Sequence, residues 1–196
     1  QLVEALGVLP QAPLAELIAG LTPADRKALS GLGLRLGYAH AFLPALLRPG
    51  RTALRARLWT AHAGRDSLPE LPDGGQVTLR SDDMPEDPAF LALCGFERFG
   101  PVALRVDILD RLARLAQRAA RNGAFEVDHE MLSLSGCGRE ELTPVLRGLG
   151  YVTERQGDRL SFRYRPRRAP RSQARRRRPR NAASPFADLS RLKLGS

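Results

Sequence analysis

The stretch that decides the fold of this chain is "DHEMLSLSGCGREELTPVLRGLGYVTERQGDRLSFRYR", residues 128–165. Asp128 can cap a short helix that Gly136 ends, and a second helix runs from there to the glycine pair Gly148 and Gly150. Two strands then follow, joined by a Gln-Gly-Asp turn, with apolar residues alternating on one face. The stretch therefore predicts two helices separated by a tight glycine turn and followed by a β-hairpin.

The residues before this stretch extend the pattern. We expect a helix that Asp107 caps, with its apolar residues at helical spacing up to Ala119. The apolar segment "AFEV", residues 124–127, predicts a short strand. Helix, strand, helix, glycine turn, helix and hairpin is the order of a winged-helix module. We therefore predict a winged-helix-like domain over residues 89–165.

The N-terminal part reads as a helical subdomain over residues 1–63. Residues 2–9 and 13–20 predict short helical pieces, and Thr22 can cap a helix that begins at Pro23. The segment 51–64 predicts an amphipathic helix with Leu54, Leu58 and Trp59 on its packed face. Residues 64–88, with four prolines, three glycines and seven acids, predict a linker or long loop containing one short strand, "QVTLR". The expected fold class is mainly α with small β.

The charge is concentrated in one segment. The chain has 31 basic and 21 acidic residues, a net charge of +10, and ten arginines but no acid lie between residues 163 and 180. Without those ten, the remaining charges balance. Because the segment is also interrupted by prolines and lacks aromatics, we expect a disordered tail over residues 166–183 that binds phosphate by charge with little sequence preference. Its arginines are Arg167, Arg168, Arg171, Arg175, Arg176, Arg177, Arg178 and Arg180.

Basic residues of the folded part add candidate nucleic-acid contacts. They are Arg111, Arg114, Arg118 and Arg121 on the first helix, Arg139 and Arg147 on the third, and Arg155, Arg159, Arg163 and Arg165 on the hairpin. In helix-turn-helix proteins the first residues of the second helix of the motif reach the bases. Here Glu140 and Glu141 stand at that position and would repel phosphate, which argues against a sequence-specific reader. A solvated helix face, or a packing platform, remains an alternative for these surfaces.

The sequence contains no self-contained enzyme. Neither lysine follows a glycine, so there is no P-loop, and the three histidines are scattered without a metal-binding spacing. We therefore expect no catalytic residue, no metal and no cofactor in this chain. The two cysteines form no CxxC pair, and no apolar run reaches a membrane span of about 20 residues. Both features favour a cytoplasmic protein that does not enter a membrane.

Beyond the tail, residues 184–196 predict a short docking helix or a frayed end. The segment "SPFADLSRLKL" begins with a capping serine and a proline. Its apolar edge consists of Phe186, Leu189 and Leu192. We expect this edge to bind a protein partner or to fold back on the chain.

Several segments resemble one family. "LTPADRKALSGLGLRLGYAHAFLPALLRPGRTALRARLW", "FGPVALRVDILDRLARL", "LRGLGYV" and "SPFADLSRLK" are similar to the C-terminal region of bacterial, chiefly alphaproteobacterial, superfamily II DExH helicases related to the mitochondrial degradosome RNA helicase. The resemblance implies an ATP- and magnesium-dependent unwinding enzyme whose motor core lies upstream of Gln1. It implies RNA or DNA as the partner, and it transfers no catalytic residue to this chain.

Three functions stay open on the sequence alone. The first is an accessory region that supports a helicase through nonspecific phosphate contacts. The second is a stand-alone winged-helix regulator that binds DNA, and the third is a protein-interaction scaffold in RNA processing that uses the C-terminal segment. Salt-sensitive binding, preference for one duplex sequence, and capture of a protein partner would distinguish them.

Overall fold

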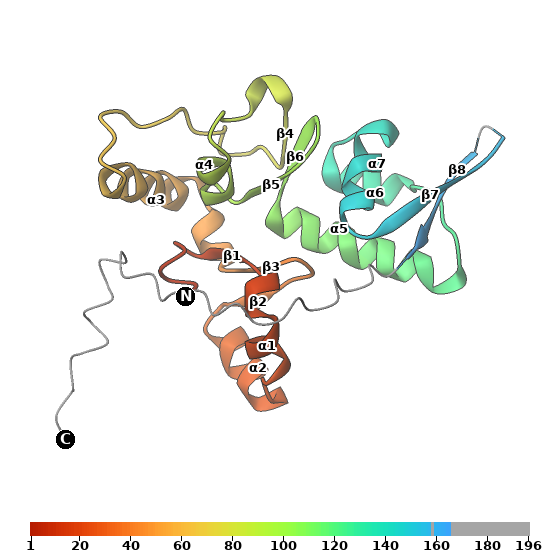
Figure 1. Ribbon diagram of the computed structural model, residues 1–196, viewed down its shortest axis with the longest axis horizontal. Coiled ribbons are helices and arrows are strands. Elements are labelled where there is room, and N and C mark those ends of the chain that lie inside the picture. Colours follow the sequence, from red (N-terminus) through yellow and green to blue (C-terminus); the bar gives the residue numbers. More distant parts are fainter. Residues whose placement is uncertain (158, 166–196) are drawn as a thin grey trace, which may run out of the picture. The chain divides into compact units, whose positions relative to one another are not determined.

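One long amphipathic helix, α5 (Val106–Ala119), organises the C-terminal half of the fold (Figure 1). The computed structural model describes residues 1–157 and 159–165. About 48% of it is helical and 19% is strand, so helices predominate, as the sequence predicts. Eight residues of α5 are buried, and they recur at the helical period because one face of the helix meets the core.

Two further helices and a hairpin pack with α5 in the predicted order. They are α6 (His129–Ser135), α7 (Arg139–Gly148), β7 (Tyr151–Gln156) and β8 (Arg159–Tyr164). The predicted cap of α6 is confirmed, since the Asp128 carboxylate accepts the Met131 N–H at 2.8 Å. Gly136 ends α6 in the left-handed conformation, with φ 65°. The hairpin is antiparallel, and Gly157 lies in its turn.

The core of this part joins all five elements. Leu112, Met131, Leu142 and Leu146 are fully buried there, and Phe162 of β8 is 1% exposed. The predicted strand over 124–127 is reduced to a single bridge, in which Phe125 and Phe162 exchange backbone hydrogen bonds of 2.9 and 2.7 Å. A short segment between α5 and α6 is thereby attached to the edge of the hairpin.

A second sheet precedes α5, with strand order β4-β6-β5. Its elements, with the associated short helices, are β4 (Thr78–Arg80), η3 (Ser81–Asp83), α4 (Pro88–Leu93), β5 (Phe96–Phe99) and β6 (Val102–Arg105). The strand predicted at 76–80 is confirmed as β4. Because Leu79 is fully buried and β4 pairs with β6, the end of the segment 64–88 belongs to a folded core. The β5–β6 hairpin was not predicted.

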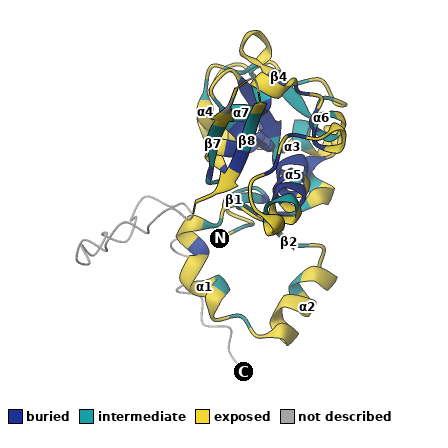
Figure 2. Cartoon of the chain, turned by 90° about the vertical axis from the view of Figure 1, so that its right-hand side faces the viewer, coloured by how far each residue is buried: buried dark blue, intermediate teal, exposed yellow. Residues whose placement is uncertain are grey.

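The N-terminal part contains a third small sheet, with strand order β1-β3-β2. Its elements are β1 (Val8–Pro10), η1 (Ala12–Leu14), α1 (Ala15–Ala19), α2 (Pro23–Gly31), β2 (Arg35–Leu36), β3 (His40–Phe42), η2 (Pro44–Leu47) and α3 (Pro49–His62). The helix predicted over 2–9 is wrong. Turns lead to Gly7, whose φ is 92°, and the next residues pair with β3 instead. Helices α1 and α2 contain no buried residue and are mostly exposed in Figure 2.

The predicted packed face of α3 is wrong for its two leucines, although Trp59 does pack on the core, against Phe90. Leu54 and Leu58 are 58% and 53% exposed, whereas Arg55 is only 4% exposed. The Arg55 guanidinium donates to the carbonyl oxygens of Leu46 and Leu93, close to the C-terminal ends of η2 and α4. A cation is favourable at helix C-termini, so this buried arginine is stabilised there by carbonyls rather than by an acid.

Asp107 does not cap α5, contrary to the prediction. The helix begins at Val106, two residues earlier than that cap would place it, and Arg105 stands at its N-cap position. The Asp107 carboxylate lies in the first turn and binds the Arg105 guanidinium at 2.7 and 3.0 Å. An acid in the first turn is favourable for the helix dipole, so it stabilises the start of α5 without capping it.

Candidate nucleic-acid interface

The first basic surface is a groove between α5 and α6. Arg111, Arg114 and Arg118 line it together with His129 and Ser133, and its volume is about 550 Å³. The three arginines share one helix face because they stand three and four residues apart. Arg114 is partly neutralised, since its guanidinium binds the buried Asp110 carboxylate at 2.8 Å. The groove thus brings three of the four arginines of the predicted stripe onto one surface, beside the Glu130 carboxylate, whereas Arg121 lies elsewhere.

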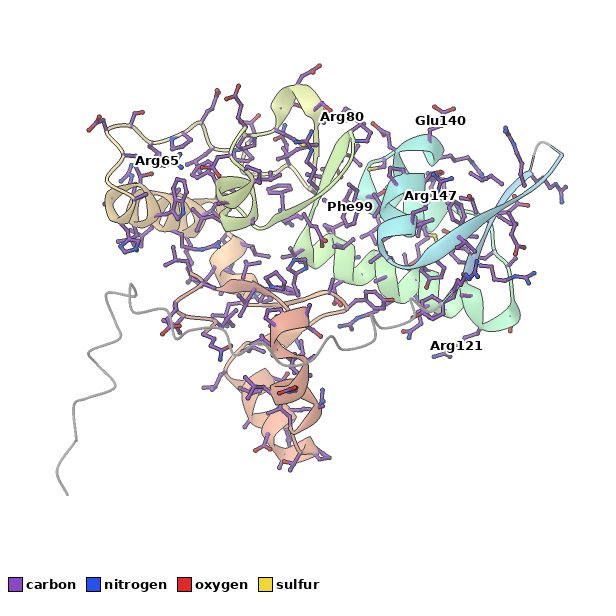
Figure 3. All side chains as sticks on the ribbon, viewed as in Figure 1. Arg65, Arg80, Phe99, Arg121, Glu140 and Arg147 are labelled. Atoms are coloured by element: carbon purple, nitrogen blue, oxygen red, sulfur yellow. The ribbon has the colours of Figure 1, made fainter. Side chains whose placement is uncertain are left out.

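The tip of α7 differs from the sequence-based expectation. Glu141 turns back and accepts the Gly138 N–H at 2.7 Å, which caps the helix. Its carboxylate also binds the Arg80 guanidinium of β4, at 2.8 and 3.3 Å. The backbone N–H of Gly138 and the guanidinium of Arg80 lower the pKa of Glu141. The prediction that both carboxylates face phosphate is therefore wrong for Glu141, whereas Glu140 is exposed and extends from the helix tip (Figure 3).

A small concavity brings the α7 tip and the hairpin together. Arg139, the first residue of α7, and Arg159, the first residue of β8, both line it, with Glu126 between the elements. Its volume is about 140 Å³, and Phe162 lies at its apolar side. Neither arginine forms an ion pair with any described side chain. Two cations from separate elements thus meet near a helix N-terminus, which itself attracts anions.

The other arginines of the hairpin are divided between its two faces. Directly paired residues lie on the same face, so Arg159 and Arg163 share one face and Arg155 lies on the other. Arg163 binds the Glu154 carboxylate at 3.2 Å. Arg165 follows β8 and donates its backbone N–H to the Gly150 carbonyl. The structure therefore does not gather the predicted hairpin arginines into one patch.

Arg147 and Arg121 lie apart from these surfaces. The Arg147 guanidinium of α7 donates to the Thr153 hydroxyl of β7 at 3.0 Å, which ties the helix to the hairpin. Arg121 follows α5 (Figure 3) and lines a third concavity with Tyr38 and Tyr164. Sequence reasoning missed these tyrosines, although Tyr164 stands between two arginines in the sequence.

Arg80 was missed as well. Its partner Glu141 is 61 residues away in the sequence, and only the pairing of β4 in its sheet brings the two together. The Arg80 guanidinium neutralises a carboxylate that the sequence places against phosphate. No sequence spacing indicates this contact.

Several predicted features lie outside the described residues. These are the tail over 166–183 with its eight arginines, and the docking segment with Phe186, Leu189 and Leu192.

Within residues 1–157 and 159–165, no group of three or more His, Cys, Asp or Glu side chains could hold a metal ion. Among those same residues, none of the helices has both the length and the apolar character needed to cross a membrane.

Comparison with known proteins gives no relative. No family model, no curated protein and no solved structure matches this chain.

Proposed function

We propose that this chain is the nucleic-acid-binding accessory region of an ATP-dependent RNA or DNA helicase. It holds the strand by phosphate contacts that carry no sequence preference. The observation that carries the proposal is the concavity lined by Arg139, at the N-terminus of α7, and by Arg159 of the hairpin, with Glu126 as its one acid. In winged-helix proteins the tip of this helix and the adjacent hairpin are the parts that approach the nucleic acid.

The element order supports the winged-helix assignment. Three helices α5, α6 and α7 precede an antiparallel hairpin, and the bridge between Phe125 and Phe162 adds a short third segment to that hairpin. The pairing of Glu141 with Arg80 removes one of the two repulsive charges from the tip of α7. The arginine-rich segment 166–180 supplies further phosphate contacts beyond the folded part.

A salt titration of binding tests this proposal. We expect the double substitution Arg139→Gln/Arg159→Gln to remove two phosphate contacts. The log–log salt slope for single strands then becomes shallower by about 1.4, and affinity at about 0.1 M salt falls about 25-fold. Fluorescence anisotropy with a labelled single-stranded oligonucleotide measures both quantities.

The matched control is Arg48→Gln/Arg57→Gln. It removes the same charge from two exposed arginines at the cap and in the body of α3. We expect a smaller loss of affinity and no change in slope, because charge outside the interface makes no phosphate contact. Equal losses for the two double variants would refute the interface. Deletion of residues 166–182 from the otherwise unchanged chain should abolish most of its nucleic-acid binding. Undiminished binding would refute the role of the tail.

The helicase part of the proposal has a separate test. The coding sequence upstream of Gln1 should contain a P-loop and a DExH motif, which bind ATP and Mg²⁺. An open reading frame that starts immediately before this chain would refute it and leave the nucleic-acid contacts unaffected.

One observation favours a second candidate, a regulator that reads duplex DNA. Because the Glu141 carboxylate binds the Gly138 N–H and the Arg80 guanidinium, one fewer negative charge opposes the approach of Arg139 to a base edge, and Glu140 and Glu126 remain. A strong preference for one duplex sequence over random duplex in competition would select this candidate over the first.

A further inference from the structure

The third concavity combines aromatic rings with a cation. Its lining residues are Tyr38, Gln117, Ala120, Arg121, Tyr151 and Tyr164, and its volume is about 250 Å³. Its lining contains no carboxylate, in contrast to the two arginine-lined surfaces described above. Pockets for drug-sized molecules begin at about 300 Å³, so this one suits a single flat ring system.

The two accessible rings are held in place. The Tyr38 backbone N–H donates to the Asp110 carboxylate at 2.9 Å, and its hydroxyl donates to the Leu149 carbonyl at 3.0 Å. Both ends of this residue are thereby fixed to the α5 and α7 region, far from it in sequence. Its side chain is still 39% exposed. The ring is therefore preorganised for contact with a ligand rather than packed away.

Tyr164 is supported from behind by the core. The buried Tyr151 meets its ring edge-on, at 5.4 Å between centroids, and Tyr151 in turn contacts Phe125. The Tyr164 side chain is 48% exposed, and a Cβ on Gly150 would come within 3.5 Å of its ring. The Tyr164 ring is thus in contact with Tyr151 and Gly150, while about half of the residue remains open to a ligand.

We propose that this concavity binds one unpaired nucleobase of a single-stranded RNA or DNA, stacked on Tyr164, with the Arg121 guanidinium on the adjoining phosphate. Stacking on aromatic side chains beside a cation is how proteins hold single strands without sequence preference. The Gln117 amide offers both a donor and an acceptor to a base edge. Interior base pairs of a duplex are stacked on both faces, so the site favours single strands.

Burial and the nearby Tyr164 phenol raise the pKa of Tyr38 to about 12. Its hydroxyl therefore stays protonated at neutral pH and keeps donating to Leu149.

The inference rests on the proposed nucleic-acid function and is tested with the full chain. The probes are a labelled oligo(dA) and a labelled abasic strand of the same length, which has the phosphates but no bases. We expect wild type to bind oligo(dA) about 5- to 10-fold more tightly than the abasic strand. This is the lower part of the range for one stacked base, because Tyr164 is only half covered.

Tyr164→Leu should reduce this ratio to about one while leaving the salt slope unchanged, since no phosphate contact is lost. Tyr164→Phe keeps the ring and should keep the ratio, which also controls for folding. Arg121→Gln should make the slope shallower by about 0.7, the value for one single-strand contact. Binding of a blunt duplex should be the same for wild type and Tyr164→Leu.

The possible failures are distinguishable. If wild type binds neither strand, the proposed function fails together with this site. If wild type binds both strands equally, or if Tyr164→Leu keeps the preference for oligo(dA), only the base site is refuted and the phosphate contacts stand.

Discussion

Replacing Glu141 by glutamine should lower stability and raise nucleic-acid affinity at the same time. The Glu141 carboxylate caps α7 through the Gly138 N–H and binds the Arg80 guanidinium. Glutamine keeps an acceptor for the N–H but loses the negative charge. We expect the free energy of unfolding to fall by about 0.5–1 kcal/mol, the lower part of the range for caps, because the site is solvent-exposed and screened.

Affinity should change in the opposite direction. Glu141→Gln removes a negative charge from the α7 tip and releases Arg80 toward phosphate. One added single-strand contact makes the salt slope steeper by about 0.7, which corresponds to about fivefold tighter binding at about 0.1 M salt. Urea denaturation measures the stability and anisotropy measures the affinity on the same preparation.

The pH dependence provides a further check on Glu141. Its folded-state pKa lies below the ordinary value of 4.5. Its contribution to stability is therefore present above pH 4.5 and is lost as pH falls through the folded-state pKa. The difference in stability between wild type and Glu141→Gln should vanish in that acidic range.

Glu140→Gln is the matched control, since it removes the same charge from the neighbouring exposed residue. We expect a small gain in affinity, an unchanged salt slope and unchanged stability, because Glu140 makes no described hydrogen bond and holds no arginine. Unchanged stability of Glu141→Gln would refute the cap. Weaker binding by Glu141→Gln would refute the placement of nucleic acid at the α7 tip.

Two predictions concern the fold itself. On α3, Leu58→Ser should change the free energy of unfolding by no more than about 0.5 kcal/mol because Leu58 is exposed, whereas Ala56→Leu should cost about 1–3 kcal/mol by overpacking a fully buried position. Urea denaturation measures both changes. A larger loss of stability for Leu58→Ser than for Ala56→Leu would instead support the packed face predicted from the sequence. Burial raises the pKa of the Cys94 thiol to about 11 and also raises that of Cys137. Native protein at about pH 8 should therefore resist a thiol reagent that reacts rapidly with both cysteines in urea, and rapid native labelling would contradict their burial.

Local signals explain which parts of the fold were predictable. Asp128, Gly136 and Gly157 act on residues within a few positions of themselves, through a cap, a left-handed helix end and a hairpin turn. A single sequence contains all the information that such features need. The order of α6, α7 and the hairpin followed from them and agrees with the structure.

Long-range contacts explain the failures. Leu54 and Leu58 of α3 suggest a packed face, but Arg55 is buried because the carbonyls of Leu46 and Leu93 converge on it. The convergence depends on how η2 and α4 end in space, which no residue spacing encodes. The β-pairing of residues 8–10 likewise outweighs the helical propensity of the preceding leucines and alanines.

In the candidate site, too, local features could be predicted from the sequence and long-range contacts could not. The arginine stripe on α5 was predictable from helical spacing, whereas the pairing of Glu141 with Arg80 and the position of Tyr38 against α5 were not. Sequence reasoning assigned repulsion to the α7 tip because it counted charges without their partners. Once these contacts are known, the tip changes from an obstacle to the central part of the proposed interface.

The same ion pairs affect how the folded part and the arginine-rich tail would divide the phosphate contacts between them. Arg80, Arg114 and Arg163 are each held by a carboxylate. The other candidate arginines of the folded part, among them Arg139 and Arg159, form no ion pair with a described side chain. The arginine-rich segment adds eight arginines, and we expect it to supply much of the electrostatic affinity, which declines steeply as salt rises. Stacking on Tyr164 involves no counterion release and declines much less. The preference for strands with bases over abasic strands should therefore persist at salt concentrations where total affinity has become weak.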